Sequence, residues 1–82
     1  MDQTIYANLE SFEDNSASEI TLSRPSRKLM ITNDGVSPMR VRLKIGSDSF
    51  MTIAPDETVT LFHRTTSLEV MDAIAHRIWS FG

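Results

Sequence analysis

Apolar and polar side chains alternate without interruption in the segment 39–45, which has the sequence MRVRLKI. Its four apolar residues fall on one face of an extended chain and its three cations on the other, as a half-buried strand requires. The pattern therefore predicts a strand over 39–45. The face of that strand that points away from the core carries Arg40, Arg42 and Lys44.

The same period of two recurs in short segments along most of the chain. Turn-forming residues separate these segments, and GSDS at 46–49 predicts a hairpin after the first strand. A helical spacing over 70–79 is interpreted as a turn that enters a final strand, and Pro25 predicts a break or a sheet edge. About six or seven short strands at this spacing predict an all-β fold, a compact antiparallel β-sandwich or barrel. The further strands are expected within 18–23, 27–33, 49–55, 57–63, 65–72 and 75–82.

The N-terminal segment 1–17 does not continue this pattern. Apolar side chains in 4–12, among them Leu9 and Phe12, are four and three residues apart, which fits a short amphipathic helix. The same stretch also suits a strand or an extended arm. We therefore predict an acidic N-terminal arm or short helix over 1–17 and a β-sandwich domain over 18–82.

Charge is distributed unevenly along the chain. The net charge is −3, yet residues 1–19 hold five acidic residues and no basic one, so 20–82 carry all eight basic residues. This asymmetry suits an acidic leader that lies on the body of the same or another chain, although a solvated arm fits as well. Acidic groups on protein, across strands or subunits, are the predicted partners of the cations in 39–45.

The candidate chemistry is sparse. There is no cysteine, and His63 and His76 are too far apart for the usual zinc spacings and lack a nucleophile motif beside them. We predict no catalytic residue, no metal site and no cofactor, and a surface or interface role for both histidines. A pI of about 5.2, with no aromatic residues interleaved among the cations, argues against nucleic acid as a partner. With no basic start and no long apolar run, we expect a soluble protein made in the cytoplasm, without contact to membranes.

A chain of 82 residues that has no cysteine, and hence no disulfide bond or thiolate-bound metal to stabilise it, can bury only a modest core. Contact with other subunits would supply further burial, and apolar side chains at both ends of the chain suit that role. The residues predicted to lie in protein interfaces are Tyr6, Leu9, Phe12, Arg40, Arg42, Lys44, Trp79 and Phe81.

Four motifs between residues 27 and 72 resemble a small β-sandwich module found in structural proteins of tailed bacteriophages. They are ITNDG at 31–35, MRVRLKI at 39–45, FMTIAPDETVTL at 50–61 and TSLEV at 66–70. The module more often has Gly where Asp56 stands.

The resemblance implies a non-enzymatic virion component: a head decoration or cement protein, a connector, or a neck, tail or baseplate adaptor. Its expected location is the virion. Its expected partners are further copies of itself and other virion proteins such as the major capsid, portal or tail proteins. The alternatives that the residues leave open are a small carbohydrate-binding module and a small nucleic-acid-binding module.

Overall fold

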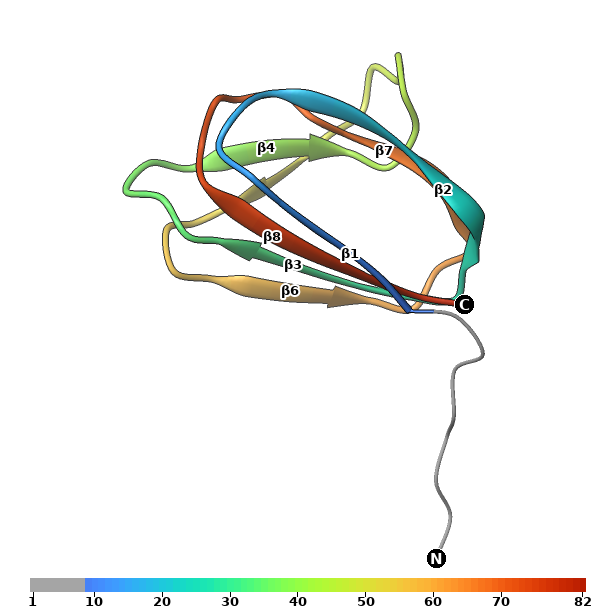
Figure 1. Cartoon of the computed structure of the whole chain (residues 1–82). Helices are drawn as coiled ribbons and strands as arrows, with labels where there is room; N and C mark the ends of the chain where they lie inside the picture. Colours follow the sequence, from blue (N-terminus) through green and yellow to red (C-terminus); the bar gives the residue numbers. More distant parts are fainter. Residues whose placement is uncertain (1–8) are drawn as a thin grey trace, which may run out of the picture.

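The computed structural model describes residues 9–82, and these form two four-stranded antiparallel sheets packed face to face (Figure 1). The first sheet has the order β1-β8-β3-β6, and the second has the order β2-β7-β4-β5. The first sheet consists of β1 (Leu9–Asp14), β8 (His76–Phe81), β3 (Lys28–Asn33) and β6 (Thr58–Leu61). The second consists of β2 (Ser18–Ser26), β7 (Thr65–Val70), β4 (Met39–Arg42) and β5 (Met51–Ile53). The predicted all-β sandwich is confirmed, with eight strands rather than six or seven.

The core lies between the two sheets and follows the alternation seen in the sequence. On β3, Leu29 and Ile31 are completely buried, whereas Met30 between them is half-exposed. On β8, Ile78 points into the core and Trp79 points away from it. The buried apolar residues are Ile20, Leu22, Leu29, Ile31, Met39, Val41, Ile53, Leu68, Val70 and Ile78.

The predicted strand over 39–45 is shorter than its alternation suggested. β4 pairs with β5 in the expected hairpin, but it ends at Arg42, and residues 43–50 form the connection. Lys44 therefore lies in a loop, so the face with three cations is reduced to Arg40 and Arg42. Alternation alone could not reveal this end, because it depends on the two neighbouring strands: β5 pairs only with 39–41 and β7 only with 41–42.

The prediction for Pro25 is confirmed. β2 lies at the edge of the second sheet. At an edge, a proline can be accommodated because its missing N–H group does not remove a hydrogen bond between strands. Pairing between β2 and β7 shifts in register between Thr21 and Ser26. The Ser26 hydroxyl is buried at this irregularity and donates to the Lys28 carbonyl oxygen at 2.8 Å.

Strands rather than helices are found in the described parts of both segments for which a helical spacing had been noted. Residues 9–14 form β1, which pairs with β8 along its whole length, so the sandwich includes these residues in addition to 18–82. Residues 71–75 form a connection, and β8 begins at His76, as expected. Tyr6 lies outside the described residues.

Two turns at the same end of the sandwich depend on particular residues. Asn33, at the end of β3, is completely buried and binds backbone groups of the following connection and of the end of β5. A methyl group on Gly35 would overlap the side chain of Ile74, so this position needs glycine for space. Asp56 adopts a φ of 62°, a left-handed conformation that Gly adopts freely and that Asp tolerates better than most residues.

Candidate interaction surfaces

The first sheet carries a partly apolar surface on the side that faces away from the core. Strand pairing places Leu9 opposite Phe81, and Met30 opposite Trp79. Phe62 directly follows β6 on the same side and is 75% exposed. We call the set Leu9, Met30, Phe62, Trp79 and Phe81 the outer apolar face.

Cations order the aromatic rings of this face. The guanidinium of Arg77 lies 5.3 Å from the centre of the Trp79 ring. The ammonium of Lys28 lies 5.1 Å from the Phe81 ring and 5.7 Å from the Phe62 ring. Such contacts contribute about 0.5–1 kcal/mol each at exposed sites, so the rings are held in place without being covered.

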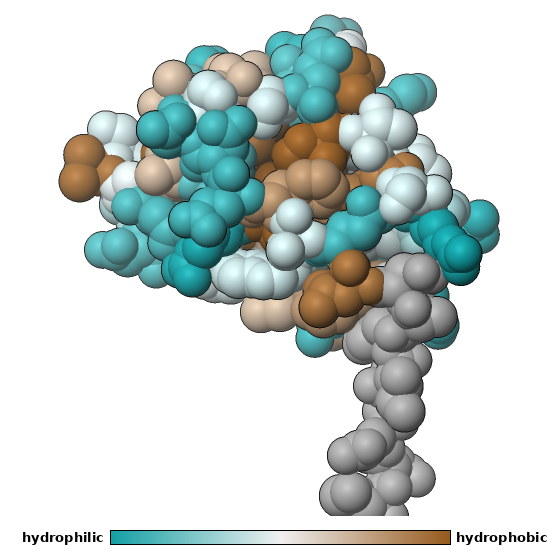
Figure 2. Space-filling model, viewed as in Figure 1, coloured by the Kyte–Doolittle hydropathy of each residue, from teal (hydrophilic) through white to brown (hydrophobic). Residues whose placement is uncertain are grey.

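The structure brings together three of the residues predicted to form interfaces. Leu9, Trp79 and Phe81 come from the two ends of the described chain and meet because β1 pairs with β8. Phe12 instead packs against the core at the gap between β1 and β2, where Figure 2 shows apolar side chains between the two sheet edges. The expectation that the C-terminal aromatic residues need burial is met only in part, because Trp79 remains half-exposed.

Arg40 and Arg42 lie on the second sheet, and both pair with carboxylates of the same chain. Arg40 forms a bidentate pair with Asp72, at 2.8 and 3.1 Å. Hydrogen bonds from Arg40 hold the pKa of the Asp72 carboxyl below its usual value. Arg42 contacts Glu69, its neighbour across β4 and β7, at 3.3 Å. Arg42 thus has its acidic partner across the pair β4–β7, whereas the partner of Arg40 lies in the connection after β7; among residues 9–82 neither partner belongs to the acidic leader.

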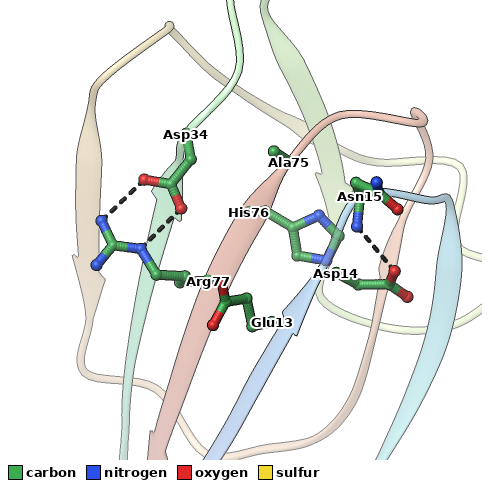
Figure 3. Close-up of a pocket in the computed structure, with 7 residues that line it drawn as sticks. All are labelled: Glu13, Asp14, Asn15, Asp34, Ala75, His76 and Arg77. Atoms are coloured by element: carbon green, nitrogen blue, oxygen red, sulfur yellow. Dashed lines mark hydrogen bonds and ion pairs between the residues drawn. The ribbon is translucent and has the colours of Figure 1, made fainter.

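A hollow of about 850 Å³ opens at the end of the sandwich where β1 finishes and β8 begins (Figure 3). Asp34 and Arg77 lie on one side of the buried His76 ring, and Asp14 lies on the other. The Asp34 carboxylate accepts two hydrogen bonds from Arg77, at 2.7 and 2.8 Å, which lower its pKa. Asp14 accepts from the Asn15 backbone N–H at 2.7 Å, and this bond is the main cause of its lowered pKa. The hollow is therefore lined by ionised carboxylates.

His76 corrects the expectation of a surface or interface role, because it is only 1% exposed. Its Nδ1 lies 2.7 Å from the Ile74 carbonyl oxygen, which can only accept, so Nδ1 carries a proton. Nε2 is buried and contacts no hydrogen-bonding group of residues 9–82. No serine hydroxyl of this part of the chain is thus in place to be activated by Nε2. His63 is exposed, as expected.

Fold and surfaces together define a small antiparallel β-sandwich with a rigid, partly apolar sheet face. Comparisons with known protein families, with curated proteins and with solved structures found no match to this chain. Within residues 9–82, no three His, Cys, Asp or Glu side chains come together in a way that could hold a metal ion. The same residues include no helix with the length and apolar character of a membrane span.

Proposed function

We propose that this protein is a non-enzymatic structural component of a tailed-phage virion. It oligomerises and decorates or bridges capsid, neck or tail components. The observation that carries the proposal is the outer apolar face, on which Leu9 is 60% and Phe62 75% exposed beside Trp79. Exposed apolar patches of this kind mark protein interaction sites, and buried Trp side chains are among the commonest anchors of such interfaces.

The position of the outer apolar face within the fold supports this role. Trp79 and Phe81 lie on β8, an interior strand that is paired on both sides, by β1 and by β3. Their backbone is therefore fixed before a partner arrives, and the rings are already oriented by cations. Little conformational entropy remains to be lost on binding. The resemblance to phage β-sandwich modules favours copies of this chain and other virion proteins as partners.

The double variant Leu9→Ser/Phe62→Ser tests the proposal. Both side chains are more than half exposed, so their removal leaves the core intact. We expect the wild-type chain to self-associate in size-exclusion chromatography with light scattering, and to bind purified capsid, portal or tail proteins in pull-downs. The double variant should lose at least tenfold in affinity, because each lost anchor costs roughly 1–2 kcal/mol.

Val36→Ser is the matched control. It removes an apolar side chain that is 95% exposed, in a loop that is not part of the outer apolar face, and it should change neither result. The proposal is wrong if the wild-type chain is a monomer at high concentration and binds none of these virion proteins.

A carbohydrate-binding module is the second candidate, because aromatic rings on a flat sheet face can stack on sugar rings. Phe62, Trp79 and Phe81 supply such a surface. A glycan array separates the two functions. Binding that is lost in Leu9→Ser/Phe62→Ser would favour this candidate, and an array without binding would remove it.

A further inference from the structure

Three arginines, two of them close in the sequence and the third about forty residues away, line one hollow at the end of the sandwich where β2 passes into β3 and β6 into β7. The hollow has a volume of about 470 Å³ and is lined by Arg24, Pro25, Arg27, Arg64 and Gly82. All three arginine side chains are exposed. Within residues 9–82 their guanidinium groups form no ion pair or hydrogen bond, whereas the other three arginines are all paired. We call this hollow the arginine hollow.

The opposite end of the sandwich is acidic. The connections that follow β1, β3, β5 and β7 lie there, because antiparallel strands alternate in direction. These connections contain no lysine or arginine. Their charged residues are Asp34, Asp56, Glu57 and Asp72, and Glu13 and Asp14 lie beside them at the end of β1. We call this the acidic end.

The two charged regions are far apart on the molecule. β2 runs between the two ends and has nine residues, which corresponds to roughly 30 Å at about 3.3 Å per residue. This exceeds the Debye length of about 8–10 Å at physiological salt. The arginine hollow is thus not neutralised by the acidic end of the same molecule.

We propose that the arginine hollow binds the acidic end of a second copy of this chain. Guanidinium groups suit this contact, because each can form a bidentate pair with a carboxylate. Glu13 and Glu57 are exposed and form no ion pair within residues 9–82. Because the two surfaces differ, the contact is heterologous and generates a ring or an open filament. The proposal deepens the proposed function and depends on it, since it assigns the contact between copies in an assembly.

A second copy fits the arginine hollow better than a nucleic acid does. Single-stranded nucleic acid needs a basic groove that follows its backbone. Along the second sheet, however, Arg40 and Arg42 are already paired with Asp72 and Glu69. What remains is a compact cluster at one end, which can contact a few carboxylates of protein loops.

Two charge-reversed variants of the full chain test the proposal. The first, Arg27→Glu/Arg64→Glu, blocks the arginine hollow, and the second, Glu13→Lys/Glu57→Lys, blocks the acidic end. Each is combined with Leu9→Ser/Phe62→Ser, so that association through the outer apolar face does not contribute to the measurement. Sedimentation velocity at low salt should show association of the chain that carries only Leu9→Ser/Phe62→Ser. Each charge-reversed variant should associate at least tenfold more weakly.

Mixing the two variants gives the decisive result. In the mixture the intact arginine hollow of one variant meets the intact acidic end of the other, and the two reversed surfaces are again opposite in charge, so association should return although neither variant associates well alone. Salt of about 0.5 M should reverse this association. Lys44→Glu, which makes the same kind of charge reversal outside the arginine hollow, should leave association unchanged.

The proposal is overturned if the chain that carries only Leu9→Ser/Phe62→Ser does not associate, or if the charge-reversed variants associate as strongly as that chain. It is also overturned if both variants stay monomeric in the mixture. Binding of nucleic acid by the same variants is measured as the fluorescence anisotropy of a labelled single-stranded oligonucleotide. Binding that requires Arg27 and Arg64 in a chain that remains monomeric would assign the hollow to nucleic acid instead. If the two charge-reversed variants leave association unchanged while Leu9→Ser/Phe62→Ser disrupts the binding of virion proteins, the contact between the arginine hollow and the acidic end is contradicted. That result would still support the proposed function.

Discussion

Asn33 is the polar side chain on which the turns at the acidic end depend most. It is 0% exposed. Its Nδ2 donates to the carbonyl oxygens of Ser37 and Ile53, at 2.8 and 2.9 Å, and its Oδ1 accepts from the Gly35 N–H at 2.8 Å. One amide therefore satisfies three backbone groups, two in the connection after β3 and one at the end of β5. We predict that Asn33→Ala strongly destabilises the fold.

The expected loss follows from the burial of the three groups. A buried polar group that loses its partner costs about 1–3 kcal/mol, which applies to the Ile53 carbonyl. The bonds to Ser37 and Gly35 are partly buried, and ordinary bonds contribute about 0.5–1.5 kcal/mol each. Asn33→Ala should thus lower the free energy of unfolding by roughly 2–6 kcal/mol. A domain of this size has a total of roughly 4–12 kcal/mol, so the fraction lost is large.

Urea unfolding followed by the fluorescence of Trp79, the one tryptophan of the chain, measures this loss. With a slope of about 1 kcal/mol per molar urea, the midpoint should fall by roughly 2 M or more. Asn15→Ala is the matched control, since this asparagine is exposed and should change stability by less than about 0.5 kcal/mol.

Asn33→Asp separates hydrogen bonding from volume. It keeps the shape of the side chain but turns an oxygen toward two carbonyl oxygens, and it should cost at least as much as Asn33→Ala at pH 7. The reasoning is refuted if Asn33→Ala unfolds within about 0.5 kcal/mol of the Asn15→Ala control.

Two further predictions concern the same end of the sandwich. Gly35→Ala should cost about 1–3 kcal/mol in urea unfolding, because the new methyl group overlaps Ile74; an unchanged midpoint would contradict this packing. Hydrogen bonds from Arg77 and Arg40 lower the pKa values of Asp34 and Asp72 below the ordinary 3.8. The unfolded chain therefore takes up protons first, and the melting temperature should fall as the pH drops below about 4. Asp34→Asn/Asp72→Asn should be less stable at pH 7 and show a weaker fall, and a fall of unchanged size would assign the acid sensitivity to other groups.

Local patterns were sufficient to predict seven of the eight strands of residues 9–82, whereas the segment of β1 was left open between a helix, a strand and an arm. Alternation in 39–45 identified the face of β4 with Met39 and Val41 as buried, because the side-chain period of a strand is two whatever the neighbouring strand is. Turn residues located the connections, and Pro25 indicated a break or an edge. The end of β4 could not be predicted, since it depends on how far β5 and β7 pair with it.

The sequence by itself thus determined an all-β fold, a sandwich or a barrel, and it indicated the terminal aromatic residues as an interface. Only the tertiary structure decided which of these residues meet, because the pairing of β1 with β8 puts Leu9 beside Phe81. It also decided which arginines are unpaired within residues 9–82. Arg40 and Arg42, which stood out in the sequence, are paired with Asp72 and Glu69. The unpaired arginines come from the end of β2 and from two connections, which only the fold brings together at one end.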